Sequence, residues 1–131
     1  MKQTIATVSL VVRDYDEAVA WYVDVLGFEL LEDQAMSPDK RWVRVAPRGS
    51  DGPALLLAAA KGDEQVAAVG RQGGGRVFLF LHTDDFDRDY PGMKERGVRF
   101  LEEPRTEVYG KVVVFEDLYG NRWDFIERFD G

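Results

Sequence analysis

A strand, a tight turn and a second strand are predicted near the C-terminus by the pattern of apolar and polar positions. Residues 112–115 are β-branched or aromatic, and residues 117–121 (DLYGN) have the composition of a turn. Residues 122–127 alternate with a period of two, which places Trp123 on one face of the strand and Asp124 on the other. The polar face of such a strand is ordinarily solvated, so Asp124 either faces water or points into a cavity.

The first half of the chain predicts a β-α-β-β-β unit. Residues 5–12 have apolar residues at all the even positions from Ala6 onward, and Thr7 and Ser9 lie on the other face with Ile5 and Val11. Asp14 is placed to cap the helix that follows, and Gly27 is placed to end that helix in the left-handed conformation. Three further strands are predicted at residues 28–32, 41–46 and 54–60.

The second half of the chain repeats this order. Residues 77–83 form a predicted strand, and Asp85 follows Asp14 at an offset of 71 residues. Gly97 follows Gly27 at an offset of 70, so one residue is deleted between the two copies. A strand at residues 98–102 and the C-terminal hairpin complete the second β-α-β-β-β unit.

The helix of the second unit contains a proline, Pro91. A proline inside a helix costs about 3 kcal/mol unless it lies in the first turn. Residues 86–90 are therefore expected to form a separate turn, with the helix beginning near Pro91.

An internal repeat of about 70 residues indicates two similar modules within one domain. The domain is expected to span residues 1–131, with module 1 at residues 1–61, a hinge at 62–75 and module 2 at 76–131. A short helix is predicted inside the hinge, ahead of three consecutive glycines. Two modules set edge to edge, each with its helix on one face, leave a concave face that suits a small ligand.

The repeat also predicts which side chains line that concave face. If the even positions of residues 5–12 pack under the helices, the odd positions and their equivalents in the second module face the ligand, together with the polar face of the last strand. Trp42 on a central strand and Tyr109 before the last hairpin are aromatic candidates for the same wall. The predicted ligand-binding residues are Thr7, Ser9, Trp42, Phe78, Phe80, His82, Tyr109, Arg122 and Asp124.

Composition narrows the class of protein. The chain has 131 residues and no cysteine, which excludes disulfides, thiolate metal sites and a cysteine nucleophile. A formal net charge of −7 disfavours a nucleic-acid partner and suits a neutral or cationic ligand. No segment approaches the roughly 20 apolar residues of a membrane helix, and the N-terminal apolar run is too short for a signal peptide. A cytoplasmic protein with no membrane partner is expected.

Three segments together resemble the vicinal oxygen chelate superfamily, which includes glyoxalase I, extradiol dioxygenases and the fosfomycin- and bleomycin-resistance proteins. They are VVRDYDEAVAWYVDVLGFELLED (11–33), TDDFDRDYPGMKERGVRFLEEP (83–104) and VFEDLYGNRWDFIE (114–127). The resemblance implies an α+β fold in which two βαβββ modules form a curved, mostly antiparallel, eight-stranded sheet with a concave cavity. It also implies a homodimer.

The metal enzymes of that superfamily bind a divalent ion through histidine and carboxylate side chains on the strands. By the resemblance, their ligand positions fall on Thr7, Phe78 and Asp124, of which only Asp124 is a credible ligand. The chain has a single histidine, His82. His82 is expected to be a hydrogen-bonded residue of the concave face or its rim and is the only candidate general base. A metal centre formed by His82, Asp124 and water is the alternative. For Arg122 and Asp124, the simplest interpretation is that they pair with each other.

No cofactor is expected, and any metal would be a weakly bound divalent ion at Asp124. Two functions stay open. The first is a binding protein of the bleomycin-resistance kind, which holds a small cationic or aromatic molecule in the sheet cavity by stacking and charge without a standard metal site. The alternative is a metal-dependent lyase, isomerase or dioxygenase of the glyoxalase type with an altered metal site. The sequence does not identify the substrate.

Overall fold

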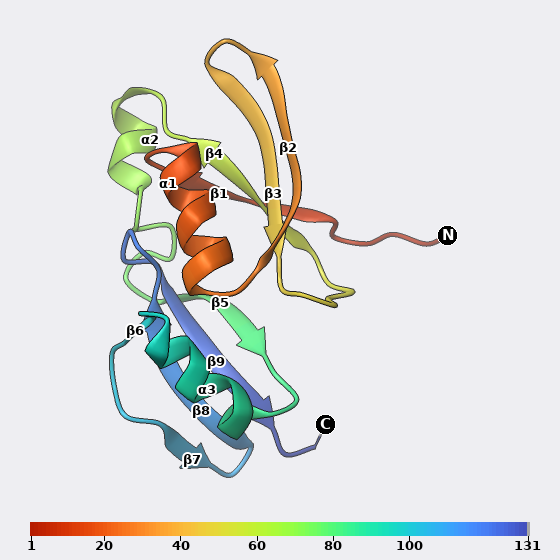
Figure 1. The fold of residues 1–131 in the computed structure, drawn as a ribbon, viewed down its shortest axis with the longest axis vertical. Helices are drawn as coiled ribbons and strands as arrows, with labels where there is room; N and C mark the ends of the chain where they lie inside the picture. The colour runs from red at the N-terminus through yellow and green to blue at the C-terminus, as the bar shows by residue number, and fades with distance from the viewer. Residues whose placement is uncertain (131) are drawn as a thin grey trace. The chain divides into compact units, whose positions relative to one another are not determined.

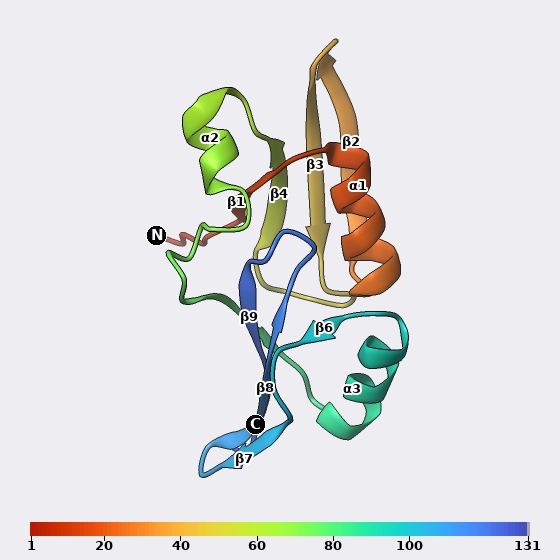
Figure 2. The same cartoon turned by 90° about the vertical axis from the view of Figure 1, so that its left-hand side faces the viewer.

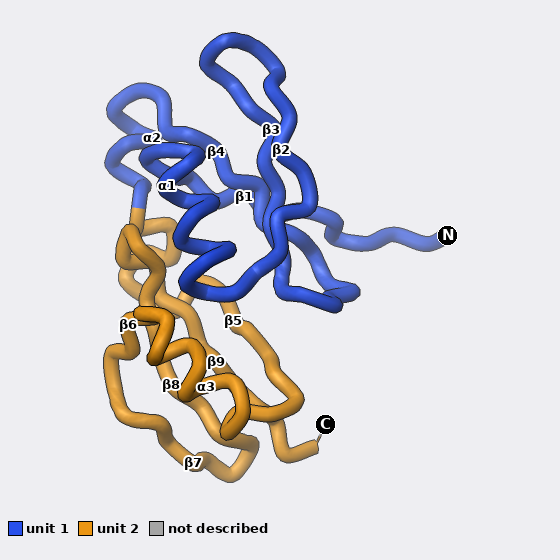
Figure 3. Tube along the Cα trace, in the orientation of Figure 1, with its two compact units in different colours: residues 1–69 blue, residues 70–131 orange. Residues whose placement is uncertain are grey.

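Each half of the chain forms a β-sheet with a helix packed on one of its faces (Figure 1). The computed structural model describes residues 1–130. The chain divides into two compact units, Met1–Val69 and a second that begins at Gly70 (Figure 3). The predicted α+β fold with two modules of mostly antiparallel strands is confirmed, and each module is described below by itself.

The first unit contains a four-stranded sheet, called sheet A, with strand order β1-β4-β3-β2. β1 and β4 are parallel, and the other two pairs are antiparallel. In Figure 2, β3 runs between β4 and β2. The strands are β1 (Thr7–Val12), β2 (Glu29–Ser37), β3 (Lys40–Ala46) and β4 (Ala54–Ala59).

A helix follows β1 as the alternation and the capping residue predicted. The side chain of Asp14 accepts a hydrogen bond from the backbone N–H of Glu17, which caps α1 (Tyr15–Ala20). The helix continues as a π-helical turn, η1 (Trp21–Val25), and the chain leaves it through Gly27 at φ 90°. A short helix, α2 (Gly62–Ala68), ends the unit and occupies the position where a short hinge helix was predicted.

Burial shows which face of sheet A carries the helix. Leu10, Val12, Val43 and Leu57 are fully buried, and α1 contacts both β3 and β4. Alternate residues of the same strands therefore lie on the opposite face of the sheet.

The second unit contains a five-stranded sheet, called sheet B, with strand order β5-β9-β8-β6 and with β7 paired to β8. β5 and β9 are parallel, and the other pairs are antiparallel. The strands are β5 (Val77–His82), β6 (Arg99–Phe100), β7 (Arg105–Glu107), β8 (Gly110–Glu116) and β9 (Arg122–Arg128).

The described residues thus form nine strands in two sheets, where the sequence predicted eight. The additional strand arises because the predicted strand at residues 98–102 is short. β6 pairs with the last two residues of β8, and the chain then leaves and returns as β7 to pair with the beginning of β8. The class of fold is unaffected.

The prediction for Pro91 was wrong. Helix α3 (Phe86–Glu95) begins at Phe86 and contains Pro91 in its interior. Asp85 caps the helix by accepting a hydrogen bond from the N–H of Arg88. Tertiary packing offsets the lost backbone bond, since Phe86 and Met93 are buried and the rings of Phe86 and Tyr90 stack with centroids 5.4 Å apart.

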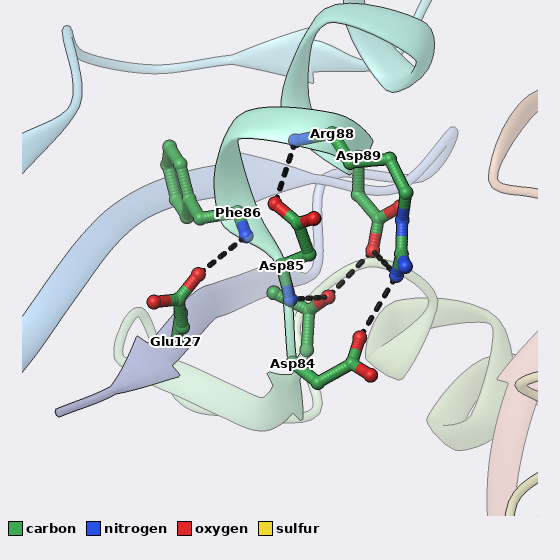
Figure 4. A network of polar contacts seen from close by, with 7 residues as sticks. Asp84, Asp85, Phe86, Arg88, Asp89 and Glu127 are labelled. Atoms are coloured by element: carbon green, nitrogen blue, oxygen red, sulfur yellow. Dashed lines mark hydrogen bonds and ion pairs between the residues drawn. The ribbon is translucent and has the colours of Figure 1, made fainter. Parts of the chain in front are cut away.

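Polar contacts tie the beginning of α3 to sheet B (Figure 4). The carboxylate of Glu127 on β9 accepts a hydrogen bond of 2.7 Å from the N–H of Phe86. Arg88 forms ion pairs with Asp84 and Asp89, each at 2.8 Å. The hydrogen bond from Arg88 lowers the pKa of Asp89. The bond to Glu127 holds the first residue of α3 on the face of sheet B that carries Glu127, and the ion pairs of Arg88 stabilise the first turn of the helix.

The turn between β8 and β9 is held by two buried polar side chains, Asp117 and Asn121. One oxygen of Asp117 accepts the N–H groups of Tyr119 and Asn121, and its other oxygen accepts the side-chain amide of Asn121. Asn121 also accepts the N–H of Gln72. A Cβ at Gly70 would lie 2.0 Å from the carbonyl oxygen of Tyr119, so this close approach requires glycine. The turn fixes the register of β9, and therefore the position of Asp124.

Among residues 1–130, no helix is long and apolar enough to cross a membrane.

Candidate functional site

One face of sheet B is packed against α3, and β9 shows which residues take which side. Trp123 and Phe125 are buried, and the ring of Phe125 lies 5.3 Å from that of Phe86 on α3. Side chains alternate along a strand, so Arg122 and Asp124 belong to the opposite face, as predicted. We call this opposite side, with Phe80, His82, Arg122 and Asp124, the sheet B face.

Phe80 and Asp124 are direct neighbours on the sheet B face. They are register partners in the parallel pair of β5 and β9. The side chain of Phe80 is 63% exposed, which is far more than the 2% of Phe125. An exposed phenylalanine at the centre of a strand has few packing partners, so it contributes little to the core and presents its ring for contact with another molecule.

The Asp124 carboxylate lies in an environment that disfavours its ionised form. Burial raises its pKa above the ordinary value, the positive charge of Arg105 opposes this effect, and the negative charge of Glu102 adds to it. Arg105 is itself engaged by Glu102 at 3.0 Å and Glu107 at 2.9 Å. Among residues 1–130, no hydrogen bond or ion pair reaches the Asp124 carboxylate, and the pairing with Arg122 that the sequence suggested does not form.

The other predicted residues of the second unit occupy three different places. His82 is exposed and is the register partner of Ile126, so it lies one step along the sheet B face from Phe80 and Asp124. Tyr109 is in the turn between β7 and β8, just before the paired residues Gly110 and Arg128. Phe78 lies at a register shift between β5 and β9. A Cβ added at Gly73 would lie 3.1 Å from the Cβ of Phe78. Phe78 is therefore held against the glycine-rich turn.

Sheet A also has a face opposite its helix, and three predicted residues belong to it. Thr7 and Ser9 on β1 pair with Ala54 and Leu56 on β4. Leu56 pairs in turn with Arg44 on β3, and Trp42 lies two residues before Arg44 on the same side of the strand. We call this side of the first unit, with Ser9, Trp42, Arg44 and Leu56, the sheet A face.

A β-bulge brings an acidic side chain to the sheet A face. The pairing of β2 and β3 shifts between Leu30 and Glu32, so Glu32 lies opposite Arg44. The Glu32 carboxylate accepts hydrogen bonds from Arg44 Nε at 2.5 Å and from Trp42 Nε1 at 3.4 Å. The bond from Arg44, followed by the bond from Trp42, lowers the pKa of Glu32.

Sequence reasoning missed Glu32 and the group of Glu102 and Arg105. Without the bulge, alternation along β2 would place Glu32 on the helix side of the sheet, so no periodic signal points to it. Glu102 follows the two-residue strand β6, and Arg105 begins the three-residue strand β7, so both strands are too short for periodicity to carry information. The motif ED in FELLED has a counterpart in the second module, RFLEEP, and this repeated acidic pair was the one available signal.

The chemistry of the side chains does not fit a divalent metal at the positions that the resemblance implies. A phenylalanine ring has no donor atom, and a single threonine hydroxyl is a weak ligand. Within residues 1–130, no three His, Cys, Asp or Glu side chains are close enough together to hold a metal ion. Asp124 is the one position of Thr7, Phe78 and Asp124 that offers a charged oxygen.

Comparison with known proteins gives concordant results. The family model described as the glyoxalase/bleomycin resistance protein/dioxygenase superfamily matches residues 4–125. A Shewanella frigidimarina (strain NCIMB 400) protein, described as an uncharacterized protein, is 54% identical over 131 residues, which cover 99% of this chain and 97% of that protein. The crystal structure of UcmS2 matches with a TM-score of 0.83 and 26% identity, over 96% of this chain and 98% of UcmS2.

A further solved structure has a descriptive name. The crystal structure of TnmS3, an antibiotic binding protein from Streptomyces sp. CB03234, matches with a TM-score of 0.72 and 29% identity. The match covers 97% of each chain.

Proposed function

This chain belongs to the glyoxalase/bleomycin resistance protein/dioxygenase superfamily, and we propose that within it the protein binds a small cationic aromatic molecule without a standard metal site. The sheet B face supplies the binding groups. The observation that carries the proposal is the pair of Phe80 and Asp124, an exposed ring beside a carboxylate that has no protein partner among the described residues.

The electrostatics of Asp124 support a cationic ligand. Burial raises the pKa of this carboxyl, so the folded protein holds a charge in surroundings that disfavour it. A positively charged group placed beside it would relieve that penalty. A net charge of −7 favours the approach of a cation from solution as well.

The exposed ring of Phe80 supports an aromatic ligand. An aromatic pair contributes about 0.5–1.5 kcal/mol beyond the burial of its area. A cation held beside Phe80 gains a further interaction with the face of the ring. TnmS3, with which the chain shares its fold at 29% identity, is named as an antibiotic binding protein, and this supports a small-molecule ligand for this chain.

A metal-dependent reaction is the less favoured candidate. The donor atoms at Thr7, Phe78 and Asp124 do not fit a divalent ion, and His82 has an exposed side chain on the sheet B face. His82 remains the candidate general base if the bound molecule is also converted. The homodimer stays a prediction that light scattering coupled to size exclusion would test.

Calorimetric titration with 2-naphthylmethylammonium tests the proposal. Asp124→Asn should weaken binding by about tenfold or more, because it removes a charge-assisted contact of roughly 1.5–3 kcal/mol. Phe80→Ala should weaken it by about fivefold, the equivalent of roughly 1 kcal/mol of stacking. Glu95→Gln on α3 is the matched control, because it removes one exposed carboxylate of the same unit away from the sheet B face.

Neutral 2-naphthylmethanol provides the second comparison, since it keeps the ring and removes the charge. The unaltered protein should bind this neutral probe more weakly than the ammonium probe. The Asp124→Asn variant should bind the two probes with equal affinity. Equal affinity of both probes for the unaltered protein, or binding that Asp124→Asn leaves unchanged, would contradict the proposal.

A further inference from the structure

An arginine of the second unit lies on the same side of sheet B as Asp124 but does not bind it. Arg105 begins β7 and is the register partner of Val112 on β8. Val112 in turn pairs with Ile126 on β9, two residues after Asp124. Residues that are directly opposite in a sheet share a face, and so do alternate residues of one strand. Arg105 and Asp124 therefore lie on one face, on opposite sides of β8.

Asp124 is within reach of an arginine at this position. Neighbouring strands lie about 4.8 Å apart, so β7 and β9 are separated by about 10 Å across β8. The electrostatics agree with this proximity, since burial raises the pKa of Asp124 and the positive charge of Arg105 opposes that effect. Arg105 is thus a cation of the protein itself that could occupy the carboxylate expected to bind a ligand.

Two glutamates hold Arg105 away from Asp124. Glu102 accepts a hydrogen bond from Arg105 Nε at 3.0 Å, and Glu107 accepts one from Arg105 Nη1 at 2.9 Å. Glu102 is itself anchored, because the same carboxylate oxygen accepts the backbone N–H of Val114 at 3.1 Å. Val114 is the register partner of Asp124 on β8. The guanidinium is therefore held along β7 and does not extend across β8.

These ion pairs are of a kind that exchanges partners readily. The side chains of Arg105, Glu102 and Glu107 are 42%, 31% and 39% exposed. An ion pair in contact with solvent contributes little to stability, so the loss of one glutamate is enough to free the arginine for a third carboxylate. Asp124 is the favoured third partner, because its charge is disfavoured by burial and a cation relieves that penalty.

We propose that Arg105 is an internal competitor for Asp124, and that Glu107, together with Glu102, is a positioning residue that keeps this carboxylate open to a cationic ligand. The inference rests on the proposed function and names the residues that regulate the same site. When Glu107 releases Arg105, the guanidinium pairs with Asp124 and excludes the ligand. When both glutamates hold Arg105, the carboxylate is accessible.

Calorimetric titration of the full chain with 2-naphthylmethylammonium tests the inference. Glu107→Gln should weaken binding by about threefold or more, the scale of a competing ion pair. Arg105→Gln should strengthen binding, because it removes the competitor. The double variant Glu107→Gln/Arg105→Gln should bind the probe as tightly as Arg105→Gln alone, since Glu107 then has nothing left to restrain.

The double variant separates the release of Arg105 from a general loss of negative charge. A glutamate that attracted the probe only by its charge would lower the affinity equally with and without Arg105. Glu103→Gln is the matched control, because Glu103 is an exposed carboxylate of the segment that carries Glu102 and Arg105, and it should leave the affinity nearly unchanged. A loss on adding Glu107→Gln to Arg105→Gln that equals its loss in the unaltered protein, or an equal loss in Glu103→Gln, would overturn the inference.

Thermal unfolding tests the same arrangement without a ligand. A double-mutant cycle of Arg105→Gln and Asp124→Asn measures the coupling between these two side chains. The non-additive change in Tm should be small in the unaltered protein and clearly larger in the Glu107→Gln background. Absence of this increase would overturn the inference even if the cation binds. Failure of the probe to bind the unaltered protein would instead contradict the proposed function, and the cycle would still decide whether Glu107 restrains Arg105.

Discussion

The sheet A face and the sheet B face are equivalent positions of a repeated module, but their charged groups are arranged in opposite ways. On sheet A, Glu32 is paired with Arg44, and this contact lowers the pKa of Glu32. On sheet B, Asp124 has no such partner among the described residues, and burial raises its pKa. The paired carboxylate orients a neighbouring arginine, whereas the unpaired one is itself available to a ligand. The repeat therefore preserves the scaffold, while the charged side chains on the two faces are arranged differently in each copy.

The largest expected effect concerns the two sides of sheet B. Trp123→Ala should lower the free energy of unfolding by about 3–5 kcal/mol, the usual cost of removing a large buried side chain. Phe80→Ala should cost distinctly less, under about 1 kcal/mol, because the Phe80 side chain is 63% exposed. Urea unfolding of both variants measures the difference. Equal destabilisation would show that the sheet B face is packed as core and is not a binding surface.

A smaller effect is expected for Asp124→Asn. The pKa of Asp124 is raised in the folded protein, so the ionised form is disfavoured there. The carboxyl therefore favours folding at pH values below its pKa in the unfolded chain. This contribution is lost as the pH rises through its pKa in the folded protein. Asp124→Asn should be as stable as the unaltered protein or more stable at pH 7, by less than about 1 kcal/mol. Its relative advantage should diminish toward pH 3.

Urea unfolding of the unaltered protein and of Asp124→Asn at several pH values checks this expectation. Asp130→Asn serves as a comparison of opposite sign, because the hydrogen bond from Arg128 lowers the pKa of Asp130. The ion pair of Asp130 with Arg128 should stabilise the folded protein at pH values above the ordinary pKa of an aspartate. This stabilisation should be lost as the pH falls. Destabilisation by Asp124→Asn that grows with pH would mean that the Asp124 carboxylate has a stabilising partner after all.

The ion pair between Arg44 and Glu32 on sheet A predicts how the pKa of Glu32 responds to substitution. Arg44→Gln should raise the pKa of Glu32 toward the ordinary value of a glutamate, because the hydrogen bond from Arg44 is the largest cause of its lowering. Arg41→Gln should leave the pKa of Glu32 in place. The pKa of Glu32 in each variant is measured by following its carboxyl carbon signal by NMR through an acid titration. A pKa of Glu32 that does not respond to Arg44→Gln would contradict the ion pair between these two side chains.

No measurable effect is expected from divalent metals. Because Thr7 and Phe78 stand at two of the three positions implied for ligands, millimolar Ni²⁺, Mn²⁺ or Zn²⁺ should not raise Tm. A metal present at 100 times its Kd would stabilise the protein by about 2.7 kcal/mol, which thermal unfolding readily detects. A rise in Tm that disappears in Asp124→Ala would instead favour the metal-dependent alternative.

The repeat made much of the fold predictable from the sequence. The offset of 71 residues between Asp14 and Asp85 identifies equivalent positions of the two modules. Asp14 forms the expected cap, and Asp85 caps a helix that begins earlier than the position near Pro91 that the sequence predicted. Alternation along β9 correctly separates Trp123 from Asp124. These features are local or periodic, and such features survive in a single sequence.

The sequence alone did not predict features that depend on a register shift or on tertiary packing. Glu32 reaches Arg44 only because of a bulge in β2, which reverses the face that alternation would give. Pro91 is accommodated inside α3 because packing around Phe86 and Met93 outweighs a local helix preference. Neither the bulge nor the packing has a periodic signature, so the contact between Glu32 and Arg44 is found only in the structure.

The most direct test of the account is the pKa of Asp124 itself, measured by NMR titration of its carboxyl signal with and without 2-naphthylmethylammonium. The account predicts a pKa above the ordinary value of an aspartate in the free protein and a clear decrease when the cation is bound, since a cation beside the carboxylate favours its ionised form. Phe80→Ala should reduce the decrease at a given probe concentration. A pKa at or below the ordinary value in the free protein, or one that the cation does not change, would contradict the claim that Asp124 is a carboxylate held in place for a positively charged ligand.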